Sequence, residues 1–121
     1  MAKVVIIDDN EIVAKALARI AKRAGRENVF YLGAEGFFND QRCERCDGLC
    51  TERLLSDVMM PGTSGLDIMR RLQDIDCPIP CRALMSGLWT NASIAEAKAL
   101  GVTAFDKGAD YPDILEWLTR K

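Results

Sequence analysis

The segment Val4-Val5-Ile6-Ile7-Asp8-Asp9-Asn10 decides the fold of this chain. Its four β-branched apolar residues are too continuous for a strand with one solvated face, so we expect a strand over residues 4–7 that is buried on both faces. Strands of that kind occur mostly in parallel sheets covered by helices. Asn10 is a favoured helix N-cap, which predicts a helix directly after the strand. The segment therefore predicts the start of a βαβ unit.

The same alternation of apolar runs and helix-like segments continues along the sequence. Further strands are expected at about residues 29–32, 54–56, 83–85 and 102–105. The first helix is expected from the Asn10 cap to Gly25, the second from near Glu35, and the third after a cap at Ser64. The fourth should begin at Thr90 or Asn91 and end at Gly101. The fifth should begin at Asp110, with Pro112 in its first turn. This strict alternation predicts an α/β fold with a doubly wound parallel sheet of five strands and five helices.

Length and charge limit the classes of function. At 121 residues the chain has the commonest size of a single domain, so we expect one domain over residues 1–121. A net charge of -2 and a pI near 5.1 give no basic stripe for nucleic acid. No apolar run approaches the roughly 20 residues that span a bilayer, and the N-terminal apolar run is too short for a signal peptide. We therefore expect a cytoplasmic protein that binds neither nucleic acid nor membrane directly.

Charged and hydroxyl side chains stand where four of the expected strands end. Asp8 and Asp9 follow the first strand, Asp57 the third, Ser86 the fourth, and Lys107 the fifth. The carboxyl ends of parallel strands meet at one edge of a doubly wound sheet, where ligands bind, so these side chains should converge.

Clustered carboxylates repel one another and raise each other's pKa values, and a hard dication removes that conflict. Mg²⁺ prefers oxygen ligands and commonly binds one or two carboxylates with phosphate oxygens. A carboxylate at such an ion can act as a nucleophile toward phosphorus and form an aspartyl phosphate. Lys107 would neutralise charge on the phosphoryl group, and Ser86 would donate a hydrogen bond to it.

The chain resembles the receiver domain of bacterial two-component response regulators, of the chemotaxis-receiver-like kind. The resemblance extends over nearly the whole chain, and the order of its motifs is more specific than any one of them. The matching segments are residues 4–10, Ser56-Asp57-Val58-Met59-Met60-Pro61-Gly62, Ser64-Gly65-Leu66, Met85-Ser86-Gly87 and Phe105-Asp106-Lys107. The resemblance implies a flavodoxin-like sheet with the strand order 2-1-3-4-5.

The resemblance also implies a function and a metal site. The domain would be a phosphoacceptor switch of a phosphorelay rather than an enzyme, assisting only its own phosphorylation and dephosphorylation. Asp9 would be the direct Mg²⁺ ligand, Asp8 would act through water, and Met59 would contribute its backbone carbonyl. Asp57 would be the phosphoacceptor, which also contacts the metal.

Two further roles concern the phosphoryl group. Ser86 would be the switch hydroxyl, and Lys107 would contact the phosphoryl group. The implied donor is a phosphohistidine of a sensor histidine kinase or a phosphotransfer protein. The downstream partner is a protein that the sequence does not name, and the chain would act alone by docking or as part of a longer protein.

Two positions depart from the family pattern. The family usually has an aromatic residue three positions before the lysine, where this chain has Ala104, and a proline in a cis peptide after it, where this chain has Gly108. Both changes concern the relay of the signal rather than phosphoryl chemistry. Trp89, three residues after Ser86, is either a substitute for the missing aromatic residue or a residue that packs at a helix start.

The cysteines offer an additional hypothesis. Cys43, Cys46 and Cys50 precede the third expected strand, and Cys77 and Cys81 precede the fourth. The two groups should lie in neighbouring loops, at the end of the sheet away from Asp57. Free thiols that pack as small apolar groups, a disulfide, and a zinc or iron–sulfur site are the three alternatives.

Other functions fit the sequence less well. A phosphohydrolase with an aspartyl phosphate has two aspartates one residue apart after the first strand, whereas Asp8 and Asp9 are adjacent. A flavin carrier of this fold class needs a hydroxyl- and glycine-rich phosphate-binding loop after the first strand. This chain has acidic residues there, and they would repel the phosphate. A degenerate receiver that acts as a protein-binding or cysteine-based redox or metal-sensing module is the remaining alternative, and the complete acidic set with Lys107 argues against it.

Overall fold

The computed structural model describes residues 3–41 and 51–120. Strands and helices alternate along this part of the chain. The strands are β1 (Lys3–Ile7), β2 (Glu27–Tyr31), β3 (Arg53–Asp57), β4 (Cys81–Ser86) and β5 (Thr103–Asp106). The helices are α1 (Glu11–Arg23), α2 (Ala34–Gln41), α3 (Gly65–Asp74), α4 (Asn91–Ala99) and α5 (Tyr111–Thr119). The predicted alternation is confirmed.

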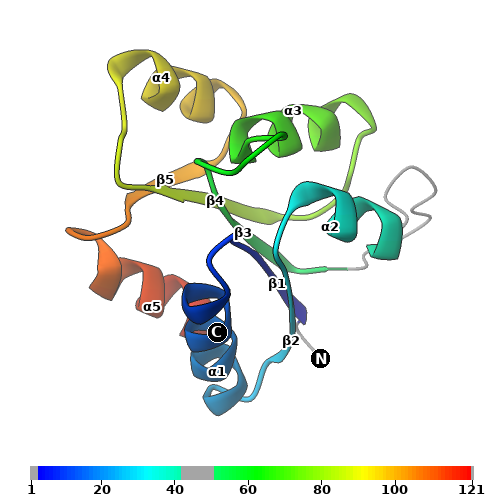
Figure 1. The fold of residues 1–121 in the computed structure, drawn as a ribbon, viewed down its shortest axis with the longest axis vertical. Coiled ribbons are helices and arrows are strands. Elements are labelled where there is room, and N and C mark those ends of the chain that lie inside the picture. Colours follow the sequence, from blue (N-terminus) through cyan, green and yellow to red (C-terminus); the bar gives the residue numbers. More distant parts are fainter. Residues whose placement is uncertain (1–2, 42–50, 121) are drawn as a thin grey trace.

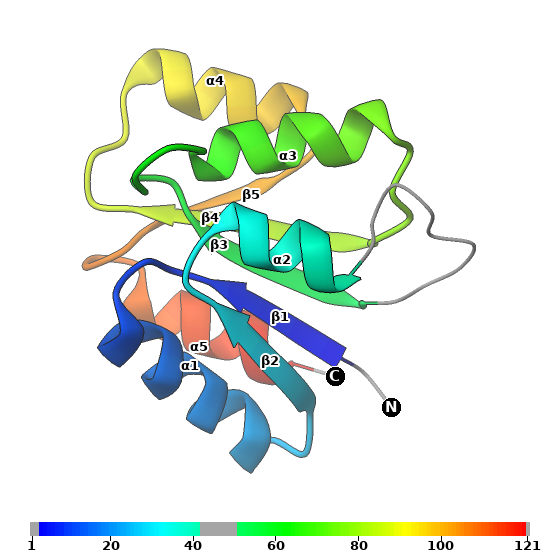
Figure 2. The same cartoon turned by 45° about the vertical axis from the view of Figure 1, so that its right-hand side comes forward.

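The strands form one parallel sheet in the order β2-β1-β3-β4-β5, as the resemblance implies. Helices α1 and α5 cover one face of the sheet, and α2, α3 and α4 cover the other (Figure 1). Figure 2 shows the loops that follow β1, β3, β4 and β5 along the same edge of the sheet. That edge is where the predicted site residues stand.

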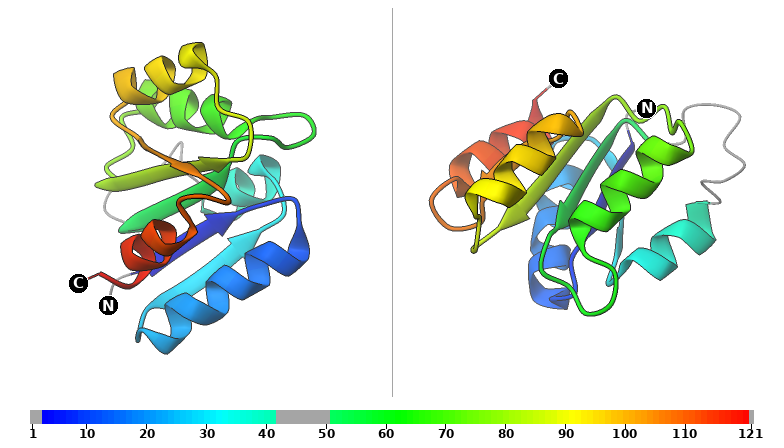
Figure 3. Two further views of the ribbon diagram at one scale, coloured as in Figure 1. Left: turned by 90° about the vertical axis from the view of Figure 1, so that its left-hand side faces the viewer. Right: turned by 90° about the horizontal axis from the view of Figure 1, so that it is seen from above.

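Alternate residues of the central strands pack into two separate cores. In β1, Val4 and Ile6 belong to the core beneath α1 and α5, whereas Val5 and Ile7 belong to the core beneath α2 and α3. This period of two is the geometry of an extended strand, and it explains why a strand buried on both faces has no polar residue between its ends. The two helical layers are seen edge-on in Figure 3.

Helix starts follow the cap residues of the sequence. The Asn10 side chain accepts hydrogen bonds from the backbone N–H groups of Ile12 and Val13. Ser64 and Thr90 form capping boxes at α3 and α4. These caps fix the points at which the loops after β1, β3 and β4 turn back over the sheet.

Two arginines, Arg26 and Arg53, are buried near the end of α5. Arg53 of β3 donates to the backbone carbonyls of Trp117 and Arg120, and its guanidinium lies 5.8 Å from the centre of the Trp117 ring. Arg26 also donates to the Arg120 carbonyl. The carbonyls at a helix C-terminus carry partial negative charge and lack partners within the helix, so the two guanidiniums anchor the end of α5.

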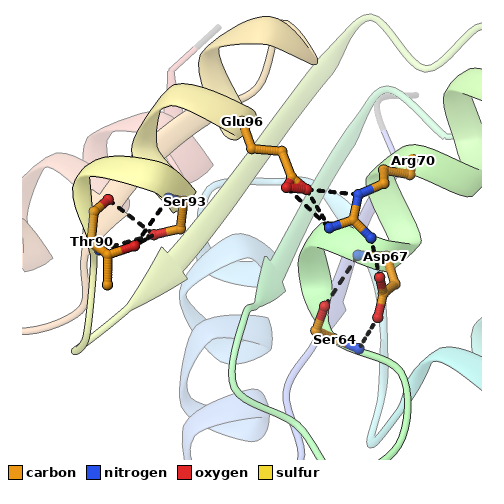
Figure 4. Close-up of polar contacts among 6 residues, drawn as sticks. All are labelled: Ser64, Asp67, Arg70, Thr90, Ser93 and Glu96. Atoms are coloured by element: carbon orange, nitrogen blue, oxygen red, sulfur yellow. Dashed lines mark hydrogen bonds and ion pairs between the residues drawn. The ribbon is translucent and has the colours of Figure 1, made fainter.

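A network of charged side chains joins α3 to α4 on the surface. Arg70 donates through Nε to Glu96 at 2.7 Å and also pairs with Asp67, which belongs to the capping box of α3 (Figure 4). On α4, Ser93 of the Thr90 capping box lies one helical turn before Glu96. The Arg70–Glu96 pair therefore joins α3 to α4, the two helices that follow the Asp57 and Ser86 loops.

No helix within residues 3–41 and 51–120 is long and apolar enough to cross a membrane.

The start of α3 lies unusually close to β3. A Cβ atom on Gly65 would lie 2.3 Å from the Asp57 carbonyl oxygen and 2.8 Å from Leu84 Cδ2. The first contact is with backbone, which has little freedom to move. Glycine at position 65 therefore lets the helix approach the strand that carries Asp57.

We predict that Gly65→Ala lowers the free energy of unfolding by about 2 kcal/mol or more, because overpacking against backbone forces α3 away from β3. Gly36→Ala is the control, since its Cβ would be in ordinary contact with Tyr31 at 3.5 Å inside helix α2. Replacing a glycine in the first turn of a helix by alanine should leave the stability unchanged or raise it by up to about 1 kcal/mol. Urea denaturation measures both, and equal stability of Gly65→Ala and the wild type would contradict the packing argument.

Candidate functional site

Three aspartates form the centre of the site at the carboxyl edge of the sheet. Asp8 and Asp9 follow β1, and Asp57 is the last residue of β3, the strand beside β1. Each offers one carboxylate oxygen to a group in which all the oxygens lie within 4.8 Å of one another. Asp8 and Asp57 are buried, and Asp9 is exposed. The convergence of these three side chains is as the sequence predicted.

Lys107 supplies positive charge to the two buried carboxylates. Its Nζ lies 2.9 Å from Asp8 Oδ2 and 3.3 Å from Asp57 Oδ2. Burial acts to lower the pKa of Lys107, but its hydrogen bond to Asp8 and the charge of Asp57 outweigh that effect, so its pKa lies above the ordinary value. Lys107 is therefore a firmly charged ammonium that touches two strand ends at once.

One ammonium does not compensate the carboxylates fully. Burial raises the pKa of Asp57, and the charge of Asp8 raises it further, while Lys107 and the backbone N–H of Met59 oppose the change. The net shift is upward. The carboxylate that the sequence singles out as nucleophile is thus destabilised in its charged form when no metal is present.

The donor atoms fit a hard dication. Carboxylate oxygens are the ligands that Mg²⁺ and Ca²⁺ take in proteins, and one exposed carboxylate beside two buried ones leaves the metal open to water and to a phosphate oxygen. The Asp8 side chain is held in place, since its Oδ1 accepts the Asn10 N–H at 2.9 Å. A metal ion would also relieve the repulsion that raises the pKa of Asp57.

Ser86 lies fully buried at the end of β4, beside the strand that ends in Asp57. Its Oγ accepts a hydrogen bond from the backbone N–H of Leu88 at 3.0 Å, and its carbonyl accepts one from Lys107 at 2.9 Å. The predicted switch hydroxyl is therefore bonded to the loop that precedes α4 and to the residue that carries the ammonium.

Met59 follows Asp57 by two residues, and its side chain is exposed. Its backbone N–H bonds to the Asp57 carboxylate. The role of its carbonyl as a metal ligand remains a prediction.

Trp89 packs against the same core cluster as Ala104, and its indole Nε1 donates to the Phe105 carbonyl at 2.7 Å. The ring therefore extends from the loop after Ser86 to the end of β5. A packed tryptophan also usually gives its indole N–H to an acceptor, so both interpretations of Trp89, substitute aromatic residue and packing residue, stay open.

Asp106 and Asp110 shape the loop around Lys107, whereas the sequence indicated them only as part of a motif and as a helix start. The Asp106 carboxylate accepts backbone N–H groups of this loop, and the Asp110 carboxylate accepts the Asp106 N–H. Aspartate in a loop beside glycine is a known signal for such side-chain-to-backbone bonds.

The structure describes only two of the five cysteines in the cysteine hypothesis. Cys77 is a buried free thiol in the loop after α3, and Cys81 is a half-buried free thiol at the start of β4. Cys43, Cys46 and Cys50 lie outside the described residues. A contact between the two groups of cysteines therefore stays a prediction.

Comparison with known proteins supports the resemblance. No family model matches the chain. The response regulator protein TmoT of Ectopseudomonas mendocina is 34% identical over 110 residues, which are 91% of this chain and 48% of that protein. The response regulator protein TodT of Pseudomonas putida is 35% identical over 75 residues, 62% of this chain and 31% of that protein. The chain thus spans less than half the length of each of these curated relatives.

Solved structures share the fold at lower sequence identity. A response regulator receiver protein from Pseudomonas putida has a TM-score of 0.81 at 24% identity, with 99% of this chain and 97% of that one covered. The BeF3-activated receiver domain of DrrB has a TM-score of 0.80 at 21% identity, with 99% and 96% covered. A response regulator from Burkholderia pseudomallei, described with a phosphorylated aspartic acid and a calcium ion, has a TM-score of 0.79 at 23% identity, with 99% and 68% covered.

The structural likenesses show the fold, and the sequence relatives are response regulators. With the acidic edge described above, they lead to one assignment: the chain is a receiver domain of the response-regulator family of two-component systems.

Proposed function

We propose that residues 1–121 form one receiver domain that takes a phosphoryl group from a partner phosphohistidine onto Asp57 in the cytoplasm. The donor would be a sensor histidine kinase or a phosphotransfer protein. The observation that carries the proposal is the contact of Lys107 with both Asp8 and Asp57, within a group of three carboxylates that fits a dication. The curated relatives, which are response regulators, support it.

In the proposed reaction an Asp57 oxygen attacks the phosphorus of the phosphohistidine, and the phosphorus–nitrogen bond breaks. The imidazole leaves with the bonding electron pair, and the phosphoryl group is left on Asp57 as an acyl phosphate. Mg²⁺, held by Asp8, Asp9, Asp57 and the Met59 carbonyl, would neutralise charge on the phosphoryl oxygens. The domain assists its own phosphorylation and later hydrolysis, so it acts as a regulatory phosphoacceptor rather than as an enzyme with a separate substrate.

The side chains of the chain itself have distinct tasks. Lys107 neutralises a phosphoryl oxygen that comes to lie between Asp8 and Asp57, because its Nζ already contacts both. The Ser86 hydroxyl donates to another phosphoryl oxygen and is drawn toward it, while its Oγ still accepts the Leu88 N–H. Leu88 and Trp89 then move with it, and the surface near α4 changes.

The surroundings of the site suit a protein donor. Three of the exposed large apolar side chains lie within three residues of site residues in the chain: Ile12 three residues after Asp9, Met59 two after Asp57, and Leu88 two after Ser86. Apolar side chains around a polar centre are typical of a protein interface.

Acetyl phosphate with Mg²⁺ should add one phosphoryl group to the wild-type protein, because Asp57 is a carboxylate nucleophile beside the predicted metal and Lys107. Intact-mass measurement detects the addition. Asp57→Asn and the presence of EDTA should each prevent it. An unchanged mass increase in Asp57→Asn would overturn the assignment of the phosphoacceptor.

Asp57→Asn should also make the metal-free protein more stable at neutral pH. The pKa of Asp57 is raised in the folded protein, so folding takes up a proton, and stability is lost as the pH rises through the raised pKa. The variant side chain does not ionise, so the variant avoids this loss of stability. Its excess stability over the wild type should shrink as the pH falls to where Asp57 is protonated in both the folded and the unfolded wild type.

Urea denaturation in EDTA over a pH series measures the difference. Asp76→Asn is the matched control, because Asp76 is exposed and its positive φ of 53° suits asparagine as well as aspartate. Added Mg²⁺ should stabilise the wild type more than Asp57→Asn. A variant that is less stable than the wild type throughout the pH range would show that Lys107 compensates the carboxylates completely.

Beryllofluoride with Mg²⁺ should change the fluorescence of Trp89, because Ser86 and Trp89 lie in one turn whose bonds the mimic would alter. The measurement needs a Trp117→Phe background, since Trp117 is the second tryptophan of the sequence. Ser86→Ala should lose most of the change and still allow phosphorylation. If emission is unaffected while ¹⁹F NMR shows the mimic bound, the loop before α4 is not the relay.

A further inference from the structure

Lys107 sits in a loop whose sequence does not favour rigidity. Glycine follows it at position 108, and glycine has the largest conformational freedom of any residue. A Cβ atom on Gly108 would make only an ordinary contact, 3.6 Å from Asp106 Oδ1, so space does not require a glycine here. Something other than the residue at position 108 must restrict the loop if the ammonium is to be held in place.

The Asp106 carboxylate provides one restriction. Its Oδ1 accepts the backbone N–H of Gly108 at 3.0 Å and that of Ala109 at 2.9 Å. The chain therefore turns around this oxygen just after Lys107. Both donors belong to an exposed part of the loop, where water would otherwise compete for them.

Asp110 provides the second restriction. Its Oδ2 accepts the Asp106 N–H at 2.8 Å, and its own N–H donates to the Asp106 carbonyl at 3.0 Å. Asp106 is thus tied to Asp110 by both of its backbone groups, and to the residues between them by its side chain. These bonds close the loop of residues 106–110 on itself.

Lys107 is the residue that this closed loop presents to the site. Its backbone N–H donates to the Ser86 carbonyl, and its Nζ reaches Asp8 and Asp57 from the same position. A lysine side chain loses rotamer entropy when it is fixed. A mobile backbone would add to that cost each time the ammonium returned to the carboxylates.

We propose that Asp106 is a positioning residue for phosphoryl transfer, which holds the Lys107 backbone so that Nζ stays between Asp8 and Asp57, with Asp110 supporting it. The catalytic part of this inference rests on the proposed function. Asp106 does not contact the reacting atoms and acts through Lys107 alone. Its loss should therefore affect the reaction only while Lys107 is present.

The first test compares phosphorylation rates with acetyl phosphate and Mg²⁺. Asp106→Ala should slow the reaction about five- to tenfold, which corresponds to the loss of one or two loop hydrogen bonds. Asp106→Asn keeps the Oδ1 acceptor and should stay within about twofold of the wild type. Asp113→Ala removes an exposed aspartate in the first turn of α5 and is the matched control for charge.

The second test is a double-mutant cycle with Lys107→Ala. If Asp106 acts only through Lys107, adding Asp106→Ala to Lys107→Ala should leave the rate unchanged. A general loss of folding would instead slow both backgrounds equally. Equal effects in the two backgrounds, or an Asp106→Ala rate equal to the wild-type rate, would overturn the inference.

A third measurement does not depend on the reaction. In metal-free protein at fixed pH, the ¹³Cε NMR signal of Lys107 should shift in Asp106→Ala toward those of exposed lysines, and it should return in Asp106→Asn. If the wild type takes no phosphoryl group but the signal shifts, the proposed function fails and the positioning role stands. If the wild type is phosphorylated and the signal of Asp106→Ala does not shift, the positioning role fails alone.

Discussion

Asp8 and Asp57 are buried at the carboxyl ends of adjacent strands, and the remainder of the site follows from the cost of burying them. A carboxylate without water needs a cation or several hydrogen bonds to remain charged. Lys107 bonds to both and so joins β5 to β1 and β3. One ammonium facing two carboxylates leaves net negative charge, which makes the site receptive to a dication. The same imbalance makes the metal-free site a poor contributor to stability.

The strand that bears Asp57 is fixed at its other end by a different charged group. All five residues of β3 are buried, and the first of them, Arg53, donates to carbonyls at the end of α5. Burial and the nearby Arg26 charge lower the pKa of Arg53, yet its hydrogen bonds replace those of water. A strand anchored at both ends provides a rigid frame for Asp57.

The sequence predicted the features that depend on local pattern. The apolar run before Asp8, the Asn10 cap and the order of the motifs were enough to place Asp8, Asp9, Asp57, Ser86 and Lys107 at one edge. The first residues of β2 were missed, because this edge strand is only half-buried and its pattern is weak. The buried arginines were missed for another reason: the partner of Arg53 is a backbone carbonyl 64 residues away, and no residue type signals it.

The departure at Ala104 illustrates how a missing side chain could be replaced from elsewhere in the fold. The resemblance leads one to expect an aromatic residue at position 104 of β5, where this chain has alanine, and a different aromatic ring, that of Trp89, lies in the loop after Ser86. The indole N–H bonds to the Phe105 backbone carbonyl, so the contact does not depend on which side chain β5 carries. In the proposed switch the ring therefore lies on the loop that moves with Ser86, and β5 supplies a fixed acceptor. The loop before α4 is then both the part that senses the phosphoryl group and the part that displays the change.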